Sequence, residues 1–530
     1  MKYSCPKCGN NMIKNGHTAA GKIRYVCYGS TGRTERTYCY STTNPKAEVA
    51  TTGGGKPQAS EKSANPKFKR ALGGVKRLVI TSAQNATPVN RPFLKSLENY
   101  CAENNAELIV VPFRYKNPTS SWSESQENAE WWDPAVVPYL YNQRKKLCAN
   151  LILLGDIKTQ PTAASPLTGF ESITHGESGI IGHPKLQMRS IPTPSHALPK
   201  LMHTTGAVTK SNYTDTKAGK KGEFHHCYAA LSVEIVGKKF HLRQLNACDN
   251  GSFTDWDREY FPGGVFEAPV PHALVLGDSH YRFMDPKVEK ATFGDNGIIE
   301  QLKPTHLIFH DLLDGYSRNH HHDNNVFIEL GKRHNGGQLH LVGKEVRDTV
   351  QFLHDMTIKH DVKSVVVSSN HDDFLRQWIV NEDWRQDPDN ATFYLETALA
   401  MVRSVRMGPG GSEHDNPFTY WIKKISGANI LCLGTDESFT LGGIELGMHG
   451  HRGPNGARGG LKSFSSIGVK SVVGHSHTPG IEGGCYQTGT SSMLRLEYTE
   501  GPSSWLNTHV VVYANGKRSH IHIIDGEFKS

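Results

Sequence analysis

Short apolar runs alternate with amphipathic stretches from residue 75 onward. Residues 76–84 (KRLVITSAQ) have the pattern of a buried strand, residues 91–105 (RPFLKSLENYCAENN) that of an amphipathic helix, and residues 106–113 (AELIVVPF) that of another strand. Residues 137–150 (VPYLYNQRKKLCAN) and 151–156 (LILLGD) repeat this helix–strand order. Strand–helix–strand order predicts a parallel sheet in this part of the chain.

A further series of apolar strands runs through the C-terminal half of the chain. The predicted strands lie in HALVLGDSH, THLIFHD, VKSVVVSSNHD, ANILCLG, GIELGMHGH and VKSVVGHSH, between residues 272 and 477. Residues 509–524 (HVVVYANGKRSHIHII) alternate with period 2 around Asn515-Gly516, which predicts a hairpin. We therefore expect an α/β fold with its strands grouped into two regions, residues 75–268 and 269–530.

The first 74 residues differ from the rest. Residues 1–42 are turn-rich and contain cysteines and tyrosines, whereas residues 43–74 are polar and almost without large apolar side chains. The latter composition is typical of a flexible linker. Residues 1–77 hold 15 Lys/Arg and 3 Glu, so their net charge is +12, while the chain as a whole carries +8. A basic segment on a mildly acidic body favours a polyanionic partner over a merely solubilising tail.

The composition is that of a globular protein, with 37% hydrophobic and 21% charged residues. No apolar run is long enough to cross a membrane, and the first residues have no signal-peptide pattern. The 10 cysteines are mostly scattered, which favours a reducing compartment. We expect a cytoplasmic protein without a membrane partner, and a homo-oligomer is left open.

Metal-type ligands follow the predicted strands of the C-terminal region. The strand ends carry Asp278 and His280, Asp311, Asn370 and His371, His449 and His451, and His475 and His477. Strand ends at one edge of an α/β sheet lie close together. Carboxylates, imidazoles and an amide suit borderline divalent metals such as Mn, Fe, Zn or Ni.

The order of these motifs resembles the calcineurin-like metallophosphoesterase superfamily, whose motifs are D-x-H, GD-x-x-D, GNH-D/E, a His before Gly, and GH-x-H. The resemblance covers roughly residues 270–500 and implies a metallophosphoesterase β-sandwich flanked by helices. We expect this sandwich to be preceded by a smaller α/β domain and a zinc ribbon.

The resemblance also implies the roles of these residues. One metal would be held by Asp278, His280, Asp311 and His477, and a second by Asp311, Asn370, His449 and His475, with Mn as the expected metal. A hydroxide that bridges the two metals would attack phosphorus, His371 would act as general acid, and Asp372 would orient it.

Three details leave alternatives open. His310 and Ser369 stand where the superfamily has glycines, so the local turns are expected to differ. His451 competes with His449 as a ligand, and His449 is favoured because it aligns with the His-Gly motif. Arg282 and Arg452 stand near the motifs and are candidates for binding the substrate phosphate, against the alternative of solvated loops.

The N-terminal cysteines have the spacing of a structural zinc site. Cys5 and Cys8 form a C-x₂-C knuckle, and Cys27 and Cys39 can complete a tetrahedral set. The segment resembles the zinc ribbons of transposases and other nucleic-acid proteins. Basic and tyrosine side chains around it favour binding of DNA or RNA, with protein docking as the alternative.

Together these features predict a metal-dependent phosphodiesterase, with a DNA nuclease similar in its core to the Mre11/SbcD-like nucleases as the preferred form. A phage-encoded enzyme that degrades DNA in the host cytoplasm would fit the same combination. The alternative is a protein or small-molecule phosphatase or phosphodiesterase whose ribbon docks to a protein.

Overall fold

The computed structural model describes residues 76–530 except 118–119, 121, 123–130, 195–196, 320–324, 335–337, 409–410 and 497–498. Of residues 1–75 it describes the backbone of four strands. The chain divides into two compact units, Met1–Lys62 and Ser63–Ser530.

The first unit contains a four-stranded antiparallel sheet with the order β1-β2-β3-β4. Its strands are β1 (Tyr3–Ser4), β2 (Asn11–His17), β3 (Ile23–Cys27) and β4 (Tyr40–Thr42). The side chains of the predicted zinc ligands Cys5, Cys8, Cys27 and Cys39, and the predicted linker 43–74, lie outside the described part of the chain. The zinc ribbon and its domain limits therefore stay predictions.

A six-stranded sheet carries most of the strands predicted in the C-terminal region. Its order is β22-β19-β18-β17-β28-β29, and β17, β18, β19 and β22 run parallel, as predicted. The predicted hairpin is also present, because β28 and β29 pair antiparallel across a turn in which Gly516 has φ 72°. The strands are β17 (Ala273–Val275), β18 (His306–Phe309), β19 (Lys363–Val366), β22 (Ile430–Cys432), β28 (Thr508–Val512) and β29 (Arg518–His522).

A second, ten-stranded sheet has the order β23-β24-β25-β27-β26-β10-β11-β9-β8-β7. Strands from both sides of residue 268 meet in it, because β26 pairs antiparallel with β10. Its strands are β7 (Arg144–Cys148), β8 (Leu151–Leu154), β9 (Ser178–Ile181), β10 (Met188–Ile191), β11 (Lys200–Thr204), β23 (Thr440–Leu441), β24 (Ile444–Glu445), β25 (Ser471–Val473), β26 (Gly480–Glu482) and β27 (Cys485–Gln487). The division near residue 268 is thus bridged by a shared sheet.

A third sheet has the order β13-β12-β5-β6, and β5 and β6 are parallel, as predicted. Helix α1 (Arg91–Glu103) covers it. Asn90 caps this helix by accepting a hydrogen bond from the backbone N–H of Phe93. The strands are β5 (Arg77–Gln84), β6 (Ala106–Phe113), β12 (Ala229–Val236) and β13 (Lys239–Asn246), and two small sheets contain β14 (Phe253–Asp255), β15 (Arg258–Phe261) and β16 (Gly264–Glu267), and β20 (Arg406–Gly408) and β21 (Gly411–Glu413).

The helix predicted over residues 137–150 is wrong. A 3₁₀ turn (Val137–Tyr139) is followed by strand β7, which pairs antiparallel with β8 at the edge of the ten-stranded sheet. Pairing with a neighbouring strand outweighs the helical pattern of this short segment, because tertiary contacts override weak local propensities.

The sheets are buried on both faces by alternating side chains. In β17, Leu274 packs against the helices on one face, and Ala273 and Val275 pack into a central core shared with the other sheets. In β5, Leu78 and Ile80 join this central core, while the intervening residue faces α1. A period of two thus separates a helix-side core from an inter-sheet core.

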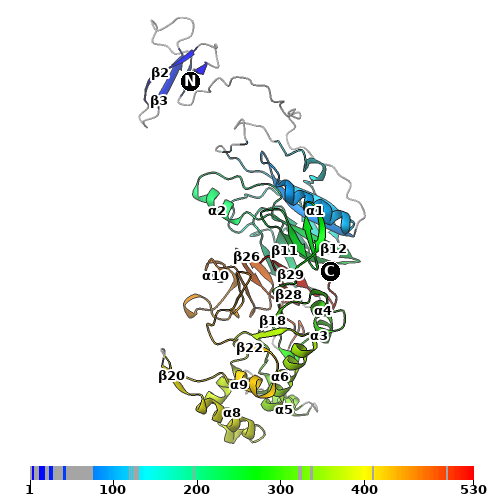
Figure 1. Ribbon diagram of the computed structural model, residues 1–530, viewed down its shortest axis with the longest axis vertical. Coiled ribbons are helices and arrows are strands. Elements are labelled where there is room, and N and C mark those ends of the chain that lie inside the picture. The colour runs from blue at the N-terminus through cyan, green and yellow to red at the C-terminus, as the bar shows by residue number, and fades with distance from the viewer. Residues whose placement is uncertain are drawn as a thin grey trace. The chain divides into compact units, whose positions relative to one another are not determined.

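The helices lie on the outer sides of the sheets of the second unit. Figure 1 shows α1 on one side and α6 (Val342–Lys359), α8 (Ala391–Arg403) and α9 (Pro417–Ile425) on the opposite side. The remaining α-helices of the described chain are α2 (Lys217–His225), α3 (Pro286–Phe293), α4 (Ile298–Leu302), α5 (Val326–His334), α7 (Phe374–Asn381) and α10 (Leu461–Ser465). No helix in the described ranges is long and apolar enough to cross a membrane.

Candidate metal centre

The polar strand ends come together, but from two sheets instead of one edge. Asp278 and Asp311 follow β17 and β18 of the six-stranded sheet, whereas His449 and His477 follow β24 and β25 of the ten-stranded sheet. The backbone N–H of His280 donates to the carbonyl oxygen of Asp311 at 2.7 Å, so the loops after β17 and β18 are tied to each other. The cluster therefore lies where the two sheets meet.

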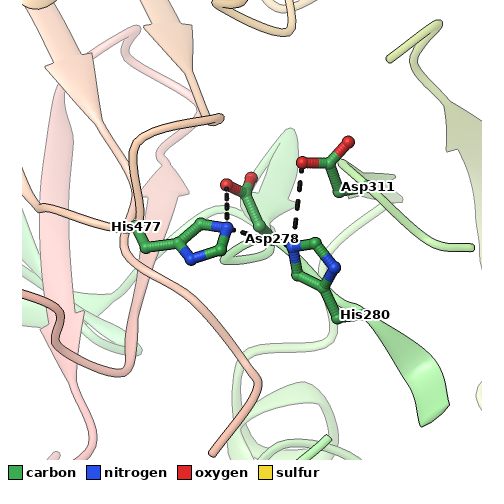
Figure 2. Close-up of side chains that lie close together, drawn as sticks. All are labelled: Asp278, His280, Asp311 and His477. Carbon is green, nitrogen blue, oxygen red and sulfur yellow. Dashed lines mark hydrogen bonds and ion pairs between the residues drawn. The ribbon is translucent and has the colours of Figure 1, made fainter. Parts of the chain in front are cut away.

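The first ligand group consists of Asp278, His280, Asp311 and His477, all buried (Figure 2). Nε2 of His280 lies 3.0 Å from Nε2 of His477 and 3.8 Å from Oδ2 of Asp311. Nε2 of His477 lies 3.2 Å from Oδ2 of Asp278. Two carboxylates and two ring nitrogens thus point at one small volume, as metal ligands do.

The second group consists of Asp311, His449 and His475. Nε2 of His449 lies 3.2 Å from Oδ2 of Asp311 and 3.1 Å from Oδ1 of Asn370. The rings of His449 and His475 are 5.3 Å apart between centroids. Asp311 belongs to both groups, so one carboxylate lies between two sets of donors.

Asp314 orients His280. Nδ1 of His280 lies 2.9 Å from Oδ2 of Asp314, and a hydrogen on Nδ1 that donates to this carboxylate leaves the lone pair of Nε2 directed into the cluster. The carbonyl oxygen of Asp314 also accepts a hydrogen bond from Nδ1 of His371 at 2.7 Å. Sequence reasoning assigned Asp314 no role, although the GD-x-x-D motif contained it.

His310 contacts Nδ1 of His449, as Asp314 contacts Nδ1 of His280. The Nδ1 atoms of these two buried rings are 3.3 Å apart, so one of them donates to the other. If Nε2 of His449 faces a cation with its lone pair, the hydrogen lies on Nδ1 of His449 and His310 is the acceptor. The residue that departs from the superfamily's glycine therefore contacts a candidate ligand, which the sequence alone gave no reason to expect.

The backbone of the cluster is strained. His280, Asp311, His475 and His477 have φ values of 40°, 42°, 75° and 57°, in the left-handed region that costs non-glycine residues about 1–3 kcal/mol each. Such residues gather at functional sites because surrounding structure holds them there. At Gly474 a Cβ would lie 2.3 Å from Oδ1 of Asp278, so only glycine fits beside this carboxylate.

The two aspartates of the first group have opposite electrostatic environments. Burial and the nearby charge of Asp311 raise the pKa of Asp278 well above its usual range. Burial alone would also raise the pKa of Asp311, but His449 and His371 outweigh it and hold that pKa well below its usual range. Burial and His449 lower the pKa of His475 to about 4, which keeps this imidazole neutral and able to ligate.

These residues fit divalent cations. Both side-chain oxygens of Asp278 are buried, and within the described part of the chain neither accepts a well-aligned hydrogen bond of the kind that normally compensates a buried carboxylate. Imidazoles combined with carboxylates suit Mn, Fe, Zn or Ni. The buried groups could therefore hold metal ions. Asn370 is exposed, and His371 and His475 are half-buried, so this side of the cluster is open to solvent.

The remaining predicted residues are the catalytic and substrate-binding candidates, which lie in the described part of the chain, and the zinc ligands, whose side chains lie outside it. The ring of His371 is 4.5 Å from that of His280, and the carboxylate of Asp372 accepts a hydrogen bond from the backbone of Leu313. Nε of Arg282 lies 3.6 Å from Oε1 of Glu345. Arg452 is exposed, in the loop after His449 and His451. The individual ligand, catalytic and substrate-binding assignments stay predictions.

Comparison with known proteins finds a similar protein in a phage. It is 34% identical to protein A1 of Escherichia phage T5 over 472 residues, which cover 86% of this chain and 83% of that protein. The chain belongs to the A1 family of phage T5. No protein-family model matches it, and no solved structure matches it. Membership of the A1 family thus rests on sequence, and the metallophosphoesterase resemblance rests on the motifs of the cluster.

Proposed function

We propose that this A1-family protein is a metal-dependent phosphodiesterase that hydrolyses DNA in the cytoplasm of a phage-infected host. The observation that carries the proposal is the position of Asp311, whose carboxylate belongs to both ligand groups. A shared carboxylate between two sets of imidazole and oxygen donors is the arrangement expected of a two-metal site. When bound, two cations would supply charge for the phosphate oxygens and a water of lowered pKa.

His371 is the proposed general acid. The carbonyl oxygen of Asp314 holds its Nδ1–H, so its Nε2 is left to donate a proton to the leaving oxygen. Burial alone would lower the pKa of His371, but Asp311 and Asp314 outweigh it and raise the pKa above the ordinary value. A raised pKa favours the protonated ring that a general acid needs.

Nucleic acid is the favoured substrate because of the charge distribution. Residues 1–77 carry a net charge of +12, as counted above, and include the predicted zinc ribbon. A basic segment of this kind raises the local concentration of a polyanion near the catalytic unit to which it is joined.

The test is hydrolysis with Mn²⁺ added. Purified protein is incubated with labelled single- and double-stranded DNA, and in parallel with p-nitrophenyl phosphate and bis(p-nitrophenyl) phosphate. The proposal expects DNA cleavage that EDTA abolishes and that Asp311→Asn lacks. Hydrolysis of the monoester alone, with intact DNA, would instead support the phosphatase alternative.

A truncation separates the two roles considered for the N-terminal segment. Deleting residues 1–74 removes the predicted ribbon and linker but none of the clustered ligands. If the segment recruits DNA, the truncated protein should keep hydrolysis of the small diester but bind long DNA more weakly, with a shallower dependence on salt. Changing Cys5 and Cys8 to Ser should have the same effect. Unchanged DNA binding and salt dependence would favour protein docking.

A further inference from the structure

A tight glycine-rich loop, residues 451–459, follows the ligand His449. The backbone N–H of Gly459 donates to the carbonyl oxygen of His451 at 3.1 Å, and that of Gly453 donates to Ala457 at 2.7 Å. Between these bonds, Arg452 and Arg458 face each other as an antiparallel bridge. A Cβ at position 459 would lie 1.8 Å from the carbonyl oxygen of Gly450, so the loop is held close to the ligand segment.

The two arginines form a non-hydrogen-bonded pair, the type in which facing Cα atoms are about 4.5 Å apart and the side chains lie closest. Like charges in this position repel each other. Both side chains are exposed, and neither forms an ion pair with an acidic side chain in the described part of the chain. The loop therefore concentrates positive charge that no acidic side chain among the described residues neutralises.

This charge lies on the open side of the cluster. Arg452 adjoins His451, whose ring lies 5.3 Å from that of His449 and 6.1 Å from that of His475. Arg458 faces Arg452 across the loop, so both arginines belong to the segment beside the half-buried histidines at the solvent side.

We propose that Arg452 and Arg458 together bind a backbone phosphodiester that flanks the phosphate being cut. The inference rests on the proposed function and makes it more specific, because a site for a second phosphate selects a polynucleotide over a phosphomonoester. Two guanidinium groups on one rigid loop can each form bidentate hydrogen bonds to phosphate oxygens. Arg282 differs, because its side chain is only 11% exposed and lies beside Glu345.

The test compares the intact protein with the Arg452→Ala/Arg458→Ala double variant. Arg403→Ala is the control, because Arg403 is exposed at the end of α8 and also lacks an acidic partner in the described part of the chain. Binding of a short fluorescein-labelled single strand is followed by anisotropy in EDTA over a range of salt concentrations. The double variant should bind about tenfold or more weakly, with a log–log salt slope about one to two units shallower, and the control should match the wild type.

Hydrolysis provides the second readout. With Mn²⁺, the ratio of kcat/KM for the oligonucleotide to kcat/KM for bis(p-nitrophenyl) phosphate should fall about tenfold or more in the double variant, mostly through KM. Unchanged binding and an unchanged ratio, or a wild type that binds no oligonucleotide, would overturn the phosphate site. A wild type that binds with the expected salt slope but cuts no DNA would instead refute the nuclease proposal and leave the phosphate site standing.

Discussion

Replacing His310 with leucine should weaken metal binding at one half of the cluster only. Nε2 of His449 faces Asp311 and Asn370 at 3.2 and 3.1 Å, and Nδ1 faces the ring of His310 at 3.3 Å. Leucine fills a similar volume but cannot accept the hydrogen bond from Nδ1 of His449. The ring then loses the contact that fixes its tautomer and orientation, and a buried N–H is left without an acceptor.

The expected loss of metal affinity can be estimated from residues that hydrogen-bond to metal ligands without touching the metal. Their removal typically reduces metal affinity by about 10–100-fold, which corresponds to about 1.4–2.8 kcal/mol. The loss should be confined to the group of Asp311, His449 and His475, because His280 keeps its own partner Asp314. One equivalent of metal should therefore bind as in the wild type and the other more weakly.

Isothermal titration with Mn²⁺, checked by the EPR signal of free Mn²⁺, measures the two affinities. His310→Asn is the matched control, because its amide oxygen can accept a hydrogen bond near the position of Nδ1, so it should retain more affinity than leucine does. Thermal unfolding of the metal-free proteins checks that both variants fold. The reasoning would be refuted if leucine left both affinities unchanged, or if both equivalents weakened equally.

Three further predictions concern single residues. Asp311→Asn should abolish hydrolysis and lower the metal content of the folded protein, measured by mass spectrometry, because both groups lose their shared carboxylate; near-wild-type activity would contradict the two-metal arrangement. His371→Ala should slow turnover about 10²–10⁴-fold while sparing metal binding, and esters with good leaving groups should suffer less than DNA; equal losses would indicate a positioning role. Asp255→Asn should lower the free energy of unfolding by about 3–5 kcal/mol, because Arg243 donates two hydrogen bonds to this buried carboxylate at 2.8 and 2.7 Å and would lose its counter-charge. Burial alone would raise the pKa of Asp255, but Arg243 outweighs it and lowers that pKa. The ionised carboxylate therefore stabilises the fold fully above its unfolded pKa of about 4, and this contribution is lost progressively as the pH falls from there through the lowered pKa of the folded state. Urea unfolding should therefore show the two proteins converging in acid, and a difference independent of pH would count against this account.

Local patterns were sufficient to predict much of the fold around the cluster. Apolar runs that end at Asp278, Asp311 and Asn370 are read directly as strands followed by polar loops, and the structure places β17, β18 and β19 there in parallel. These inferences succeed because the period of side-chain burial and the change from apolar to polar residues are properties of a few consecutive residues. The parallel pair β5 and β6 and the C-terminal hairpin were predictable for the same reason.

Long-range pairing was not predictable in this way. Nothing local indicates that β26 pairs with β10, so the sharing of one sheet by strands from both sides of residue 268 could not be inferred. Residues 137–150 show the same limit. Their amphipathic pattern predicts a helix, but part of the segment forms the edge strand β7 because it pairs with β8. Strand partners depend on which segments meet in space, and burial patterns do not encode that.

The candidate site was also only partly predictable from the sequence. The candidate ligand types at the strand ends can be read from the sequence, and the resemblance to the metallophosphoesterase motifs grouped Asp278, His280, Asp311 and His477 before any fold was known. Their convergence from two sheets, and the roles of Asp314 and His310 behind the ligand rings, depend on distances across loops far apart in the chain. Those distances exist only after the sheets have packed, because a hydrogen bond to a ring nitrogen requires its acceptor within about 3 Å.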